Sequence, residues 1–142
     1  MSRWTSKADR LAEHLRTLPM LDCIEICVHR ENDLRAKVNQ QLAKNKGTGV
    51  VVITWIGGRN PDRRSAKLRM GARYSITLWM ARVMNDRTPA DDIVEAIGEH
   101  IHGWVDPAPG SLVNRLEVTD IDLIPEEPAM LVYEILAEIS RV

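Results

Sequence analysis

The sequence Gly49-Val-Val-Val-Ile-Thr-Trp-Ile56 is followed by a turn-rich basic segment, Gly57-Gly-Arg-Asn-Pro-Asp-Arg-Arg-Ser-Ala-Lys67, and by a longer stretch that extends to Val83. In that stretch one set of alternate positions is apolar, namely Leu68, Met70, Ala72, Tyr74, Ile76, Leu78 and Met80. A period of two residues is typical of a strand with one buried face, so residues 50–83 predict a long hairpin. Two strands alone are marginally stable in water, and we therefore expect further strands and at least one covering helix.

The rest of the chain supplies those elements. We expect helices from Thr5 or Ser6 to Leu18, from Asn32 to Lys44 and from Thr88 to His102, and strands over Leu21–Val28, Leu112–Ile124 and Met130–Ile139. The order α-β-α-β-β-α-β-β predicts an α+β fold, a largely antiparallel twisted sheet with helices packed on it. A length of 142 residues and ordinary globular composition favour a single domain over residues 1–142.

Three of these elements carry specific expectations. The half-polar second face of Leu21–Val28 predicts an edge or solvent-facing strand. In the helix that begins at Thr88, isoleucines at 93, 97 and 101 form an apolar stripe that fits the buried face of the hairpin. The apolar positions of 112–124 change parity between Val118 and Ile121, which indicates a β-bulge.

The N-terminal residues lack the apolar core of a secretory signal, and no run approaches the roughly 18 to 20 apolar residues that span a bilayer. We therefore expect a soluble, cytoplasmic protein without a membrane partner. Cys23 and Cys27 fall in one predicted strand, where four residues separate them by about 13 Å, too far for a disulfide. We expect reduced, mostly buried thiols.

The sequence carries no recognisable catalytic motif. Residues i and i+2 of a helix point apart, so His100 and His102 with Glu99 are a poor metal site, and their place near a helix C-terminus suits the helix dipole. Cys23, Cys27 and His29 lack the fourth ligand of a zinc site. We expect no enzyme, no cofactor and no metal, with a small enzyme that uses His100 or His102 as a remaining alternative.

Charge is unevenly distributed although the formal net charge is −1. Residues 59–73 contain six basic side chains against one acid, Asp62, and residues 117–138 contain seven acids and no Lys or Arg. Trp79 falls on the polar face of the long strand, and an exposed tryptophan is typical of an interface core. These features predict a partner surface. Each feature also has a simpler interpretation. The basic segment can be a hairpin that faces only water, and Trp79 can be covered by a helix of the same subunit.

The chain resembles the tail-terminator (tail-completion) proteins of long-tailed phages of the lambda-like and Mu-like kinds. The resemblance rests on the size, the first helix, the strands Val50–Ile56, Arg73–Arg82 and Leu131–Ile139, and the helix that begins at Pro89. It implies a structural α+β subunit without catalytic residues that forms a hexameric ring on the tail tube, ends tube polymerisation and presents a surface to head-completion or connector proteins. It also implies a place at the head-proximal end of the virion tail, with DNA contacted only as it passes through the lumen.

In a ring, one patch of each subunit meets a different patch of its neighbour, and a basic hairpin and acidic C-terminal strands are complementary patches of that kind. Our candidate interface residues are Arg59, Arg63, Arg64, Lys67, Arg69, Arg73, Trp79, Glu126, Glu127, Glu134 and Glu138. The alternative function is a small nucleic-acid-binding module whose hairpin, residues 59–73, contacts phosphates. That function calls for more exposed aromatic residues or a larger positive charge than this chain has.

Overall fold

The computed structural model describes residues 3–22, 24–29, 49–58, 64, 71–81, 90–108, 115–124 and 130–139. Their elements are α1 (Arg3–Leu15), the short 3-10 helix η1 (Pro19–Leu21), β1 (Glu25–His29), β2 (Val50–Gly57), β3 (Ala72–Ala81), α3 (Ala90–Ile101), β4 (Glu117–Ile124) and β5 (Met130–Ile139). The helix predicted over 32–44 lies outside these residues.

The five strands form one sheet in the order β1-β2-β3-β5-β4. The β1–β2 pair is parallel, and the other three pairs are antiparallel. The predicted hairpin is present as β2 and β3, with Ile53 opposite Ile76. These observations confirm the α+β class and the largely antiparallel sheet. They also place β1 at an edge, as predicted from its half-polar second face.

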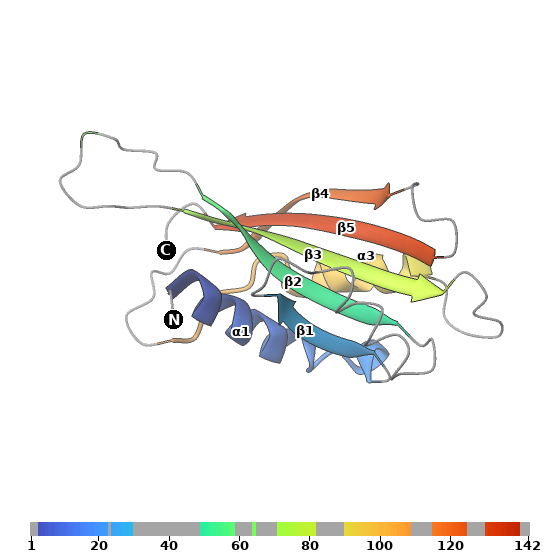
Figure 1. Ribbon diagram of the computed structural model, residues 1–142. Helices are drawn as coiled ribbons and strands as arrows, with labels where there is room; N and C mark the ends of the chain where they lie inside the picture. Colours follow the sequence, from blue (N-terminus) through green and yellow to red (C-terminus); the bar gives the residue numbers. More distant parts are fainter. Residues whose placement is uncertain are drawn as a thin grey trace.

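Helices α1 and α3 lie on one face of the sheet (Figure 1). Helix α1 packs over β1 and β2, and α3 packs over β4 and β5, with the two helices in contact. The predicted stripe of α3 is buried, with Ile97 and Ile101 fully enclosed. It was expected to cover the β2–β3 hairpin, and this expectation was wrong, because β5 lies between β3 and β4 and brings the β4–β5 pair under α3.

Tyr74, Ile76, Leu78 and Met80 of β3 are all buried against the helices, as the alternation predicted. The expectation that β3 has a single buried face was wrong, because Ser75, Thr77 and Trp79 on its other face are buried as well. Element ends differ from the predictions. Helix α1 ends at Leu15, before Leu18, and β1 begins at Glu25, because the chain from Pro19 to Leu21 makes a 3-10 turn whose first residue is a proline. The predicted bulge is confirmed, because the register of β4 on β5 shifts between Val118 and Asp120.

Candidate interaction surface

The sheet face opposite the helices is organised in rows of neighbouring side chains. One row runs from Asp122 of β4 through Glu134 and Thr77 to Val52 and Cys27 of β1. The next row contains Ile124, Val132, Trp79 and Val50. This face is therefore apolar at the end that carries Trp79, across β4, β5, β3 and β2, and becomes mostly polar on β4 and β5 from the row of Asp122 and Glu134 onward.

Trp79 belongs to the apolar end. It lies on the face that the alternation predicted, but its expected exposure was wrong, because only 8% of its surface is accessible. Val50, Val52 and Val132 pack with it in a second, small core cluster. Its indole N–H donates a hydrogen bond of 2.9 Å to Thr77 Oγ1. Trp79 thus stabilises the subunit and offers little surface to a partner.

Five carboxylates occupy the other end of this face. They are Glu117, Asp120 and Asp122 of β4 and Glu134 and Glu138 of β5, which we call the acidic strip. Glu117 lies directly opposite Glu138, and Asp122 directly opposite Glu134. Like charges in such positions repel one another, and each pair costs about 0.2–1 kcal/mol relative to a neutral pair. A positively charged group bound to the acidic strip would therefore lower the free energy of the folded subunit by relieving this repulsion.

Two of the predicted acids, Glu134 and Glu138, lie in this strip. Glu138 is exposed, and Glu134 is half-buried and accepts a 2.8 Å hydrogen bond from the Ser75 hydroxyl. Arg73 is exposed and sits beside Glu138 on the next strand. We expected Arg73 to meet acids of a neighbouring subunit or of the tube. In the structure it already lies beside Glu138 of its own subunit.

Among the remaining predicted interface residues, Arg64 is exposed. The others, Arg59, Arg63, Lys67, Arg69, Glu126 and Glu127, lie outside the described residues. Sequence reasoning left Glu117, Asp120 and Asp122 out of the interface. The available signal was the alternation Asp120-Ile-Asp-Leu123, which puts acids on one face and apolar residues on the other.

Strand β4 is the edge of the sheet on this side, and six of its eight side chains are exposed. On the helix-bearing face, Ile121 and Leu123 keep 44% and 51% of their surface accessible. Ile121 leans over α3, because a Cβ placed on Gly98 would lie 3.1 Å from its Cδ1. The edge thus exposes apolar side chains on one face and carboxylates on the other.

A buried ionic cluster fixes α1 to the segment after α3. The Asp106 carboxylate, with 1% of its side chain accessible, accepts hydrogen bonds from Lys7 Nζ at 2.6 Å and from Arg10 Nε and Nη2 at 2.6 and 2.7 Å. It also accepts one from the Ala108 N–H at 3.0 Å. Burial by itself raises the pKa of Asp106, but these hydrogen bonds outweigh it and hold the pKa well below its usual range.

Tyr74 joins the same end of α1 to the sheet. Its hydroxyl donates a 2.8 Å hydrogen bond to the Trp4 carbonyl, and the Trp4 ring stacks on Trp55 with the ring centroids 5.1 Å apart. Burial raises the pKa of the Tyr74 hydroxyl, and the negative charge of Asp106 raises it further. These contacts hold the start of α1 on the hairpin.

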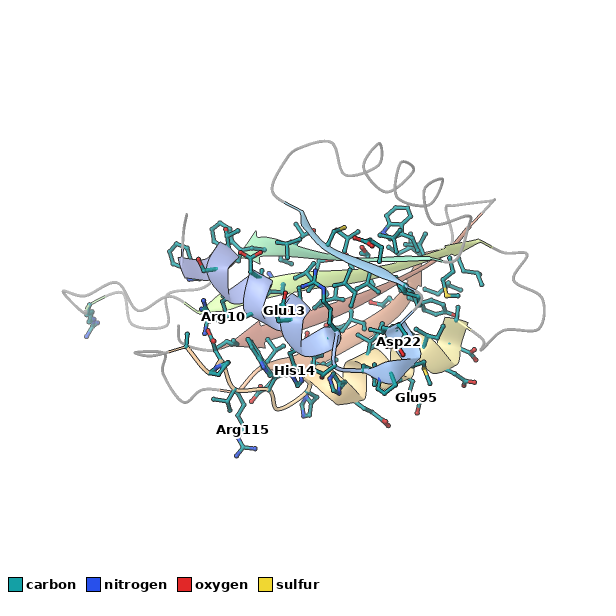
Figure 2. The ribbon with its side chains drawn as sticks, turned by 90° about the horizontal axis from the view of Figure 1, so that it is seen from below. Arg10, Glu13, His14, Asp22, Glu95 and Arg115 are labelled. Atoms are coloured by element: carbon teal, nitrogen blue, oxygen red, sulfur yellow. The ribbon has the colours of Figure 1, made fainter. Side chains whose placement is uncertain are left out.

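Two stacked histidines join the C-terminal ends of the helices. The rings of His14 and His100 lie 4.2 Å apart and nearly parallel. Because a carbonyl can only accept, the His14 Nε2–H donates to the His100 carbonyl and the His100 Nε2–H to the His14 carbonyl, at 2.9 and 3.0 Å. Figure 2 shows His14 at the end of α1 that adjoins α3.

His102 has a similar structural role, since its Nδ1 accepts the Val118 N–H at 3.1 Å. In the described part of the chain, no three His, Cys, Asp or Glu side chains gather where they could hold a metal ion. The described helices include none that is long and apolar enough to cross a membrane. Comparison with models of protein families gave no match to this chain, and a search among curated proteins gave none.

Proposed function

We propose that this chain is a structural subunit of a phage-like tail, which forms a ring on the head-proximal end of the tail tube, ends tube polymerisation and joins the head-completion or connector proteins. The pattern of elements that resembles tail-terminator proteins supports the proposal. The observation that carries it combines structure and sequence: the structure gathers an acidic strip along β4 and β5, and the sequence places six basic residues between 59 and 73.

Separated charges of this kind favour contacts between unlike patches. In a ring, each subunit meets its neighbour through two different surfaces, so the acidic strip of one copy can face the basic segment of the next. Arg73 lies beside Glu138 of its own subunit, and our proposal places Lys67 and Arg69 of the same basic segment against the neighbour. Such attraction sets orientation and the rate of encounter more than affinity.

The same geometry weighs against the nucleic-acid-binding alternative. Phosphates are bound by basic side chains, and the carboxylates of Glu138 and Glu134 on the same face as Arg73 would repel a phosphate near it. In addition, Trp79 is buried and cannot stack on a base. DNA that passes through the lumen of a ring needs no such surface.

Assembly on cognate tail tubes tests the proposed function. We expect sedimentation to show the purified chain bound to tubes, and negative-stain images to show one ring at a single end of each tube. We expect Arg69→Glu with Arg73→Glu to reduce tube binding. The same substitutions should leave the thermal unfolding of the subunit within about 1 kcal/mol of wild type, because Arg73 is exposed. Tubes that elongate equally with and without the chain, and bare tube ends, would exclude the function.

A further inference from the structure

The outer edge of β4 is the described surface that the fold of a single subunit explains least. Among the described strands β4 pairs only with β5, so its other side has no strand beside it. Such an edge presents backbone N–H and C=O groups with which a further strand can pair. The side chains there are exposed on both faces of the sheet, Ile121 and Leu123 on the face of α3 and Asp120 and Asp122 on the other.

The free part of this edge begins after Val118. Just before the strand, Leu116 exchanges backbone hydrogen bonds of 2.7 and 2.8 Å with residues 103–104. The Val118 N–H in turn donates to His102 Nδ1 at 3.1 Å. The chain that follows α3 therefore occupies the beginning of the edge, and residues 120–124 are left without a neighbouring strand among those described. At about 3.4 Å per residue they are roughly 17 Å long, which is the length of an ordinary strand.

The side chains of this edge specify what an added strand must carry. A strand beside β4 places its residues alternately on the two faces, whichever direction it runs. Residues that fall beside Asp120 and Asp122 gain attraction if they are basic, and residues beside Ile121 and Leu123 bury apolar surface if they are aliphatic. Asp122 also lies opposite Glu134 of β5, so a cation beside it relieves an existing repulsion. The strand that fits therefore alternates Lys or Arg with aliphatic residues.

The described edge strands of a second copy do not have this pattern. Two β4 strands would bring Asp120 and Asp122 of one copy against the same acids of the other. Strand β1, at the opposite edge of the sheet, contains Glu25 and no Lys or Arg. Its Ile26 carbonyl already accepts a hydrogen bond of 3.0 Å from Arg16 Nη2. Self-pairing through the described edges is therefore disfavoured, which is a usual protection against aggregation.

We propose that residues 120–124 of β4 accept an extended segment of a different protein, in which Lys or Arg alternates with aliphatic residues, as a further strand of the sheet. Main-chain hydrogen bonds hold such a segment to the edge, and the alternation of charged and apolar contacts sets its register. The inference goes beyond the proposed function, because it concerns the edge of the sheet and requires neither a ring nor a tail tube. It leaves the acids of β5 to the neighbouring subunit of the proposed ring.

Peptide binding to the full chain tests the inference. The probe is the synthetic peptide Thr-Lys-Val-Lys-Leu-Arg-Val-Thr with both ends blocked, and its control has the same residues in an order without alternation. Fluorescence anisotropy at about 0.1 M salt should show the alternating peptide bound about tenfold more tightly than the control. Amide hydrogen exchange at residues 120–124 should slow when the alternating peptide binds, because backbone pairing protects the outer N–H groups.

Charge exchange identifies the edge as the binding site. In the variant Asp120→Lys with Asp122→Lys, the basic peptide should bind about tenfold more weakly, and a peptide with Glu in place of each Lys and Arg should bind instead. The control Glu95→Lys with Glu99→Lys makes the same charge change on exposed positions of α3 and should bind the basic peptide like wild type (Figure 2 labels Glu95). Circular dichroism checks folding, and Asp122→Lys alone serves if the double variant is not folded.

Three results would overturn the inference: no binding of the alternating peptide or equal binding of its control, unchanged exchange at residues 120–124, and equal binding by wild type and the Asp120→Lys, Asp122→Lys variant. Self-association of the wild-type chain that the same two substitutions abolish would overturn it as well, because the edge would then belong to a second copy. The assay contains no tail tubes, so its failure leaves the proposed function standing, and bare tube ends would exclude the tail function alone.

Discussion

Replacement of Asp106 by alanine should strongly destabilise the subunit. The substitution leaves Lys7, whose side chain is 4% accessible, as a buried cation without its anion. Removal of one partner from a buried ion pair typically costs about 3–5 kcal/mol. Arg10 is 33% accessible and can regain water, so it adds little, while the Ala108 N–H loses an acceptor. We expect a loss of about 3–4 kcal/mol.

Equilibrium urea unfolding and thermal melting measure this loss. For a chain of this length, about 3 kcal/mol corresponds to a decrease in melting temperature of roughly 10 °C. The matched control is Glu95→Ala on the exposed face of α3, which should change stability by less than about 0.5 kcal/mol. The double variant Lys7→Met with Asp106→Leu removes both buried charges and should recover most of the loss, since apolar replacement of a buried pair is often nearly neutral.

The pH dependence of the same variants has a definite sign. Because the folded-state pKa of Asp106 lies below its ordinary value of 3.8, its contribution is complete above about pH 4 and is lost as the pH falls further. The difference in unfolding free energy between wild type and Asp106→Ala should therefore stay constant from pH 7 to about pH 4 and narrow below it. A difference under about 1 kcal/mol at pH 7, or one that does not narrow in acid, would refute the reasoning.

Three further predictions concern single side chains. Tyr74→Phe should cost about 1 kcal/mol at pH 7 through the lost hydrogen bond to Trp4. Wild type should lose stability as the pH rises past the ordinary tyrosine pKa of 10.0, and the same substitution should remove this loss. Chemical denaturation between pH 7 and 11 measures it, and an equal alkaline loss in the variant would contradict the prediction. Gly98→Ala should raise unfolding stability by about 0.5 kcal/mol in thermal melts, because alanine favours the helix and the half-exposed Ile121 can move aside; a lowered melting temperature would show that it cannot. Trp79→Ala should cost the subunit about 3–5 kcal/mol in urea, whereas a surface contact would leave its stability unchanged.

Predictions of which side of an element packs against the helices agreed with the structure. The alternation in β3, the isoleucine stripe of α3 and the change of parity at the β4 bulge each depend on residues close together in the sequence. Periodicity reports which side of an element is buried, because the geometry of a strand or helix fixes where successive side chains point. It does not report which other element lies against that side, and α3 was accordingly assigned to the wrong pair of strands.

The error over Trp79 has a related cause. The continuous apolar run Val50-Val-Val-Ile53 is typical of a strand buried on both faces, and this signal indicated apolar cover beside Trp79. Alternation in β3 alone pointed to a polar second face. The buried state of Trp79 follows from Val50, Val52 and Val132, which come from two other strands.

The amino-acid sequence by itself determined the elements, their buried sides and the separation of basic and acidic segments, because these depend on residue type and short-range spacing. The tertiary structure decided which distant groups meet. Lys7 and Asp106 are 99 residues apart, and no local pattern marks them as partners. The strand order likewise placed Glu117, Asp120 and Asp122 beside Glu134 and Glu138 and left β4 at an edge, because strand pairing depends on the packing of the whole chain.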